Sequence, residues 1–206
     1  MSSSTSASST VLHQKMVPAA YLVILSGFWM YTGITTNNFS NWLAESSLFV
    51  STIIILIAFY RHFRFSLVAY SCFFVFLFLH LHGAHYSYPK APAGFWIQEM
   101  LHLNRNPYDR LVHFGFGLLM VLPMYELAKG PLTLKKHMRW WWPLELVLAL
   151  SIVYELAEWL VAAVIFPNLG TSYLGYQGDM WDAQKDVSAA FAGAVIALVF
   201  IRILRR

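Results

Sequence analysis

Residues 175–186 read GYQGDMWDAQKD, and the run that follows them stays mainly apolar as far as Leu204. The stretch spaces Asp179, Asp182 and Asp186 at intervals of three and four residues. If a helix begins near Asp179, this spacing puts the three carboxylates on one helix face. Charged side chains are costly beside lipid, so that face is expected to turn toward protein or water. The pattern predicts a membrane-spanning helix with a polar site at its start.

The composition of the chain is that of a polytopic membrane protein. Of its 206 residues, 58% are hydrophobic and 12% are charged, against about 25% charged in soluble domains. The single cysteine, Cys72, excludes a disulfide framework and a cysteine-based metal site. The predicted fold class is an all-α membrane protein, a bundle of six transmembrane helices. These helices are predicted at residues 17–34, 42–60, 65–82, 108–127, 142–166 and 182–204.

Other segments are predicted to lie outside the bundle. Residues 1–15 begin with a Ser- and Thr-rich run and are predicted to form a disordered tail. This leaves residues 16–206 as the six-helix transmembrane domain. Residues 83–106 and 167–178 are predicted to be the longer loops on the outer side, where they would cover the polar site.

The distribution of Lys and Arg predicts the orientation of the bundle. Ten of the 14 basic residues fall in segments on the same side as the N-terminus. Cytoplasmic segments of membrane proteins carry an excess of Lys and Arg. Both termini are therefore predicted to be cytoplasmic, in a multi-pass protein of the cell inner membrane. The net charge of +4 therefore follows from membrane topology. The predicted partner is the lipid bilayer, and the charge does not indicate nucleic acid as a partner.

The acidic residues have the opposite distribution. Eight of the ten fall in outer loops or in the outer halves of predicted helices. They are Glu45, Glu99, Asp109, Glu155, Glu158, Asp179, Asp182 and Asp186. Asp and Glu contribute little to membrane orientation, so no targeting rule demands this arrangement. The asymmetry predicts a polar site in the outer half of the bundle.

Several predicted helices contribute candidate residues to this site. Asp109 and His113 are neighbours at i, i+4, and Glu155 and Glu158 share a face at i, i+3. Carboxylate and imidazole groups bind divalent metals, so a divalent metal is the candidate cofactor. The candidate metal ligands are Asp109, His113, Glu155, Glu158, Asp179, Asp182 and Asp186. The candidate catalytic residues are Asp109, His113, Glu155, Glu158 and Asp182. The candidate substrate-binding residues are Arg110, Lys185, Gln177 and Gln184.

Three interpretations of this cluster remain open. The first is a structural network of salt bridges in which Arg110 and Lys185 neutralise the acids. The second is a divalent-metal site, and the third is a proton or cation pathway in a small transporter. Two nearby cations face six acids, so the excess negative charge needs protons, a cation or another partner. No HExxH or GxSxG motif is present, so hydrolase chemistry with a serine nucleophile is not supported.

Three motifs together resemble the YjdF-like family of predicted bacterial inner-membrane proteins, which are built on a domain of unknown function. The motifs are NPYDRLVHF at 106–114, YELAEW at 154–159 and the stretch at 175–186. The resemblance covers about residues 21–204 and departs from the family pattern at Pro107, where that pattern has His. The DRxxHF element is also distantly similar to the opening of VanZ-like membrane proteins, which are linked to glycopeptide-antibiotic tolerance. These resemblances imply a fold and a site, but no settled reaction.

The leading hypothesis is a site open to the outer leaflet or periplasm. It would bind a divalent cation and bind or act on an anionic lipid or envelope precursor, with Arg110 and Lys185 holding the anionic group. Alternatives are a proton- or cation-coupled transporter and a structural membrane subunit. A subunit could use the small residues Ala189, Ala190, Ala192, Gly193 and Ala194 as a partner face, unless they pack internally. The sequence leaves open whether the protein is an enzyme and what its oligomeric state is.

Overall fold

The computed structural model describes residues 3–165 and 177–204, and helices account for most of them. No strand occurs within these two ranges. The elements in chain order are α1 (Ser3–Thr35), α2 (Phe39–Phe59), α3 (Leu67–Tyr86), η1 (Tyr88–Lys90), α4 (Pro92–Met100), α5 (Tyr108–Lys129), α6 (Met138–Leu160), η2 (Val161–Ile165) and α8 (Asp182–Leu204). The η1 element is a 3₁₀ turn and η2 is a π-helical turn that continues α6. The predicted all-α fold is thus confirmed for the described residues.

Six of the described helices are long and apolar enough to cross a membrane. Their spans are Lys15–Thr35, Phe39–Phe59, Leu67–Tyr86, Tyr108–Lys129, Met138–Val164 and Asp182–Leu204. Each lies within a few residues of its predicted position. The first span begins at Lys15 although α1 itself begins at Ser3, so the division into a tail and a membrane domain stays a prediction.

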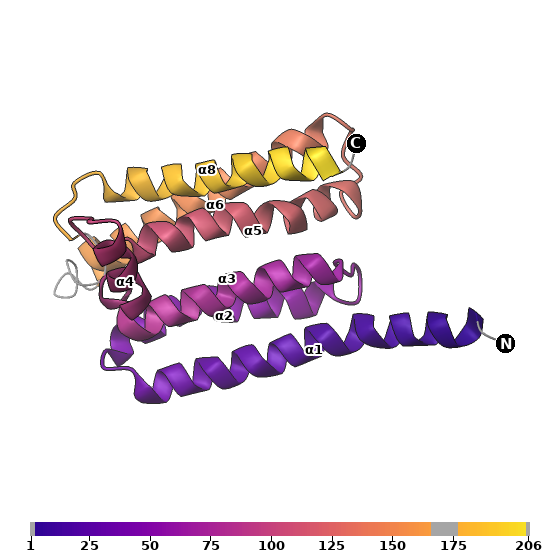
Figure 1. Cartoon of the computed structure of the whole chain (residues 1–206), viewed down its shortest axis with the longest axis horizontal. Helices are drawn as coiled ribbons and strands as arrows, with labels where there is room; N and C mark the ends of the chain where they lie inside the picture. Colours follow the sequence, from indigo (N-terminus) through magenta and orange to yellow (C-terminus); the bar gives the residue numbers. More distant parts are fainter. Residues whose placement is uncertain (1–2, 166–176, 205–206) are drawn as a thin grey trace.

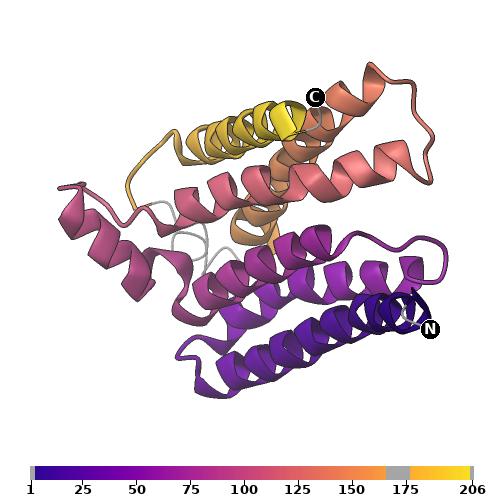
Figure 2. The same cartoon turned by 45° about the vertical axis from the view of Figure 1, so that its right-hand side comes forward.

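The helices form two groups that meet along α3 and α5 (Figure 1). Helices α1, α2 and α3 lie on one side, and α5, α6 and α8 lie on the other. The start of α1 and the end of α8 lie at the same end of the bundle, which we call the terminal end. Helix α4 lies at the opposite end, the α4 end (Figure 2). Because the number of spans is even, the start of α1 and the end of α8 lie at the same end. The side of the membrane that each end faces stays a prediction.

The backbones of α5 and α8 approach each other closely at two glycines. A Cβ atom added at Gly117 on α5 would lie 1.9 Å from the carbonyl oxygen of Ala190 on α8. One added at Gly193 on α8 would lie 2.2 Å from the carbonyl oxygen of Phe114 on α5. Glycine at both positions is therefore what lets the two backbones touch, as small residues do in membrane helix pairs.

The buried face of α8 runs from the first residue of the helix to Ala197. It consists of Asp182, Asp186, Ala190, Gly193, Ala194 and Ala197. Three of the five small residues considered as a partner face, Ala190, Gly193 and Ala194, therefore pack internally. Because Asp182 and Asp186 continue the same stripe, packing turns their carboxylates toward α5 rather than toward lipid.

The prediction of a loop across 83–106 is wrong for about two-thirds of its length. Helix α3 continues to Tyr86, and η1 and α4 follow. Proline supplies the reason for these starts: Pro89 lies inside the first turn of η1, and Pro92 is the first residue of α4. Proline is favoured there because its fixed φ suits a helix and its missing N–H has no helical partner at that position. The other predicted loop, 167–178, lies outside the described residues except for its last two.

Candidate functional site

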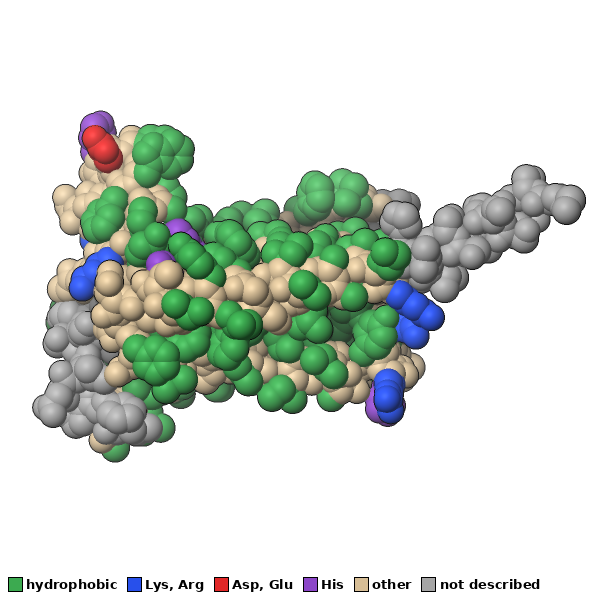
Figure 3. Space-filling model, turned by 90° about the horizontal axis from the view of Figure 1, so that it is seen from below, with side chains coloured by type: hydrophobic (Ala, Val, Ile, Leu, Met, Phe, Trp, Pro, Cys, Tyr) green, Lys and Arg blue, Asp and Glu red, His purple; other side chains and the backbone are tan. Residues whose placement is uncertain are grey.

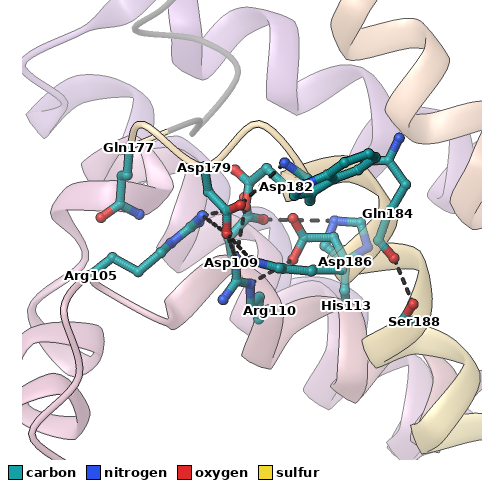
Figure 4. A network of polar contacts seen from close by, with 12 residues as sticks. Arg105, Asp109, Arg110, His113, Gln177, Asp179, Asp182, Gln184, Asp186 and Ser188 are labelled. Carbon is teal, nitrogen blue, oxygen red and sulfur yellow. Dashed lines mark hydrogen bonds and ion pairs between the residues drawn. The ribbon is translucent and has the colours of Figure 1, made fainter.

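An ion-pair network ties the start of α8 to the start of α5 at the α4 end (Figure 4). The Arg105 guanidinium contacts the Asp182 carboxylate, and its Nη1 lies 3.7 Å from Oδ2 of Asp179. Nη2 of Arg110 lies 2.5 Å from Oδ2 of Asp179 and 3.4 Å from Oδ1 of Asp182. Two arginines from one segment therefore hold two aspartates from the other.

Asp179 is part of this network, although it lies in the turn before α8. The three aspartates do not share one helix, because α8 begins at Asp182, where the sixth span was predicted to begin. Asp179 instead closes the preceding turn: its Oδ1 accepts the Trp181 N–H at 3.2 Å, and its carbonyl accepts the Asp182 N–H at 3.0 Å. Side-chain hydrogen bonding to backbone N–H groups is the usual reason why Asp stops short of a helix.

The Asp179 carboxylate is stabilised in its charged form. Nζ of Lys185 lies 2.7 Å from Oδ2 of Asp179. This hydrogen bond, together with those from the Trp181 N–H and from Arg110, holds the pKa of the Asp179 carboxyl well below its usual value. Lys185 is half-exposed, and Asp179 is its ion-pair partner within the described residues.

Three buried carboxylates lie behind these ion pairs. Asp109 on α5 and Asp182 and Asp186 on α8 each present an oxygen within 4.8 Å of the other two. Their exposed fractions are 8%, 8% and 2%. Oδ2 of Asp182 and Oδ1 of Asp186 have no hydrogen-bond partner among the described residues. The nearest cation to Asp186 is Nε of Arg110, at 3.9 Å from Oδ1. We call Asp109, Asp182 and Asp186 the carboxylate triad.

His113 connects the triad to α6. Its Nε2 lies 3.7 Å from Oδ1 of Asp109 and 3.1 Å from Oε1 of Glu155. Its Nδ1 lies 3.5 Å from the Ser151 hydroxyl. Asp109 and His113 therefore meet at i, i+4 on α5 as predicted, and Glu155 approaches them from α6.

A second polar group lies between α6 and the first three helices. The Tyr154 hydroxyl donates to Oε2 of Glu45 at 2.6 Å. His80 bonds the Glu45 carbonyl through Nε2 at 3.0 Å and the Tyr88 hydroxyl through Nδ1 at 2.6 Å. A carbonyl only accepts, so Nε2 carries a proton and, in a neutral ring, Nδ1 accepts from Tyr88. Burial raises the pKa of the Tyr88 phenol well above its usual value.

Glu158 lies between the two polar groups. It is 8% exposed and interacts electrostatically with Asp109, Glu45 and Glu155. Three residues after it, the chain widens into the π-helical turn η2 (Val161–Ile165). Turns of this kind recur at functional sites because they redirect side chains.

The two glutamines predicted to bind substrate take different positions. Gln177 pairs with the backbone of Asn106: its Oε1 accepts the Asn106 N–H, and its Nε2 donates to the Asn106 carbonyl, both at 3.1 Å. Gln177 thereby ties the segment before α8 to the segment before α5. Gln184 lies on the exposed side of α8, and its carbonyl accepts the Ser188 hydroxyl (Figure 4). No contact joins its side chain to the triad in the described part of the chain.

Comparison with known proteins identifies the family. Residues 17–206 match the family model described as "Predicted membrane protein (DUF2238)". The chain belongs to the DUF2238 family. It is 35% identical over 173 residues to the inner membrane protein YjdF of Escherichia coli strain K12, a match that covers 84% of this chain and 82% of YjdF. No solved structure matches the chain.

The DUF2238 assignment confirms the resemblance that the three motifs indicated. Together with the six apolar helices, it makes the chain an integral membrane protein, and the name of its relative supports a multi-pass position in the inner membrane. The family description names no reaction. The roles of individual residues in this DUF2238 protein therefore have to be argued from their geometry.

Two residues that sequence reasoning did not select are central to this cluster. Arg105 contacts Asp182, and Asn106, with 1% exposure, holds α4 against α5. The Asn106 side chain accepts the Tyr108 N–H at 3.0 Å and donates to the Ala91 carbonyl at 3.0 Å. For Asn106 the available signal was its place at the start of the NPYDRLVHF motif, because residues that open a polar helix are well placed to fix its first turn.

Proposed function

We propose that the carboxylate triad binds a divalent cation, and that this cation and the two arginines together bind an anionic lipid or envelope precursor. The observation that carries the proposal is the approach of three buried carboxylates to within 4.8 Å of one another. Buried charges are strongly disfavoured unless they are paired or coordinate a metal. Here Oδ2 of Asp182 and Oδ1 of Asp186 have no hydrogen-bond partner among the described residues.

The charge balance of the cluster supports a divalent ion. Its five acids are Asp109, Glu155, Asp179, Asp182 and Asp186, and its three cations are Arg105, Arg110 and Lys185. With every one of these groups ionised and His113 neutral, the cluster keeps two negative charges. One divalent cation cancels them. Otherwise, protons have to occupy two of the carboxyl groups.

The ligand type indicates a hard cation. Carboxylate oxygens suit Mg²⁺, Mn²⁺ and Ca²⁺. Calcium binds oxygen at about 2.3–2.6 Å, so ligands on opposite sides of it are separated by about 4.6–5.2 Å. The triad oxygens lie within 4.8 Å of one another, less than the greatest separation of two oxygens bound to one calcium ion.

The arginines have donors available for an anion. Nε and Nη2 of Arg105 and Nε of Arg110 have no hydrogen-bond partner within the described residues. Guanidinium groups bind phosphate and carboxylate through pairs of N–H donors, and a metal with a fixed cation is a common way to stabilise phosphoryl charge. We infer that a phosphate-bearing headgroup is the ligand class that fits this combination.

If the site performs a reaction, His113 and Glu155 are its acid–base pair. They contact each other at 3.1 Å, and His113 lies 3.7 Å from Asp109. A histidine that contacts a carboxylate can take up or release a proton beside a metal-bound ligand. Glu158, which is deeper in the bundle, would act as a positioning residue through its charge.

Metal content measured by mass spectrometry on detergent-purified protein tests the proposal. Asp186→Asn and Asp109→Asn keep the side-chain size and remove one ligand charge each. Glu145→Gln, an exposed acid near the terminal end, is the matched control. We expect about one metal per chain in the wild type and in the control, and a loss in both Asn variants. A folded wild type that stays metal-free after metal is supplied would contradict the proposal.

A second candidate is a proton pathway, which the arrangement of the buried groups favours. Titratable side chains follow one another from Asp186 through Asp109, His113 and Glu155 to Glu158, and on to Glu45. Such series occur in proton-coupled membrane proteins. Proton flux into liposomes that is lost in Glu158→Gln but kept in Glu145→Gln would favour this function over metal binding.

A further inference from the structure

An apolar cavity lies between α1, α2 and α3, away from the carboxylate triad. It measures about 370 Å³, a size typical of small-molecule ligand pockets. Its lining includes Leu25 and Leu77, which are almost completely buried, and it extends to Tyr60 and Arg61 at the end of α2. The cavity therefore runs from the middle of the first helix group to the terminal end.

Positive charge surrounds the open end of this cavity. Lys15 and Arg61 both line it and are both exposed. Neither forms an ion pair with the described residues. The Arg64 guanidinium lies 5.0 Å from the ring centre of Tyr60, another lining residue. Figure 3 shows Lys and Arg side chains at this end of a face that is otherwise largely hydrophobic along the helices.

The acid at the end of α5 already has partners of its own. Glu126, at the end of α5, accepts the Ser66 N–H at 2.9 Å and the Ser66 hydroxyl at 2.6 Å. Its charge therefore supports the start of α3 and does not neutralise Lys15 or Arg61. An apolar cavity with uncompensated cations at its mouth is complementary to a molecule with a long apolar chain and an anionic head.

The first helix has the weakest protein contacts of the six spans. Only 11% of its apolar window is buried, against 44% for α3 and 56% for α5. It packs mainly on α3, and its side-chain hydrogen bonds to α2, Trp29 to Ser46 and Trp42 to Thr32, lie toward the α4 end and away from Lys15. An apolar chain between α1 and α2 would supply the packing that these two helices do not provide for each other.

We infer that this cavity binds one anionic phospholipid. An acyl chain lies along Leu25 and Leu77, and the phosphate group meets Lys15 and Arg61. A Lys or Arg near a membrane surface strengthens the binding of anionic lipid about 5-fold. Removing both cations is therefore expected to weaken binding by roughly 30-fold. The site is independent of the carboxylate triad and of the function proposed for it.

Native mass spectrometry after delipidation tests the inference, with phosphatidylglycerol and phosphatidylcholine as probes. We expect the wild type to retain one phosphatidylglycerol in preference to phosphatidylcholine. Lys15→Gln/Arg61→Gln should lose that preference. The control, Lys135→Gln/Lys136→Gln, removes two exposed lysines of the α5–α6 connection and should keep it. Equal retention of both lipids by the wild type, or an equal loss in the control, would overturn the inference.

A variant that fills the cavity tests the position of the acyl chain. Ala19 lines the cavity, and Ala19→Phe narrows it while leaving both cations in place. We expect the retained lipid to be lost in this variant. The elution volume and thermal melting of the protein establish that it is folded. If folded Ala19→Phe retains the lipid as the wild type does, the chain does not occupy the cavity. Should Ala19→Phe not fold, Leu22→Phe on the same wall gives the same test.

Discussion

The Arg105 guanidinium contacts the carboxylate of Asp182, the first residue of α8. Both side chains are largely buried, with exposed fractions of 12% and 10%. Arg105 also lies near Asp179, and Asp182 near Arg110, so the pair is the centre of a network. Removing one partner of a buried ion pair leaves the other charge uncompensated, which is far more costly than removing both. The contribution of the pair can therefore be measured by comparing the two single variants with the double variant.

Arg105→Gln is expected to lower the free energy of unfolding by about 3 kcal/mol, because it leaves Asp182 buried without its main partner. Asp182→Asn should have a similar effect. The double variant should cost clearly less than the sum of the two, since both charges are then absent. Reversible unfolding in mixed micelles measures the three values. Strict additivity would show that the contact does not stabilise the fold.

Gly117→Ala is expected to destabilise the bundle by about 1–3 kcal/mol through overpacking. Its new methyl group would lie 1.9 Å from the Ala190 carbonyl oxygen, so α8 has to move away from α5. Because the same face of α8 carries Asp182 and Asp186, any metal bound by the triad should be lost as well. Thermal melting and metal content are the measurements.

Gly27→Ala is the matched control for this change. It lies on α1, and a Cβ atom there would have nothing within 4 Å. It should leave melting temperature and metal content unchanged. Because alanine has a higher helix propensity than glycine, a destabilisation of the same size at both positions would mean that the effect does not arise from the α5–α8 contact.

The six spans could be predicted from the sequence because hydropathy is a local property. Each of the runs near 20 residues carries its own signal, irrespective of what it packs against. The meeting of Asp109, Asp182 and Asp186 was also foreseeable, since acids at the same depth of one bundle end have no favourable place except beside one another or water. Their roles, in contrast, stay a prediction.

Residues whose contacts cross long sequence distances were not foreseeable. Arg105 lies 77 positions from Asp182, and nothing in its neighbourhood distinguishes it from an arginine of a loop. The position of Asp179 before the helix was not foreseeable for a related reason: Asp179 fits the helical spacing equally well, and only its bond to the Trp181 N–H shows that it closes a turn. Helix α4 was missed because nine residues are too few for a membrane signal, although Pro92 marks its start.

Acid should loosen the turn before α8. Lys185, the Trp181 N–H and Arg110 lower the pKa of Asp179 below its unfolded value, which is about 3.9. A carboxyl group of this kind stabilises the fold above its unfolded pKa, and this stabilisation is lost as pH falls toward the folded pKa. Hydrogen exchange at the Trp181 amide, which bonds Asp179, should therefore stay protected at neutral pH and lose protection in strong acid.

Lys185→Gln tests whether Lys185 is the cause of the lowered pKa of Asp179. It removes the hydrogen bond with the largest influence on Asp179, so protection of the Trp181 amide should disappear at a higher pH than in the wild type. Lys136→Gln, an exposed lysine between α5 and α6, controls for the change in net charge. An unchanged midpoint in Lys185→Gln would assign the protection to Arg110 and the backbone instead.

Tyr154→Phe is expected to cost about 1.5–3 kcal/mol, the range for a hydrogen bond to a charged group. The Tyr154 hydroxyl donates to Oε2 of Glu45 at 2.6 Å, and Glu45 is 3% exposed, so its carboxylate would remain buried with one partner fewer. Tyr31→Phe, at an exposed position, is the control. Unfolding in mixed micelles measures the stability, and proton flux in liposomes measures the second candidate function. A stable Tyr154→Phe protein with reduced proton flux would mean that the hydroxyl conducts protons, whereas a loss of stability alone would make the Glu45 group a structural network.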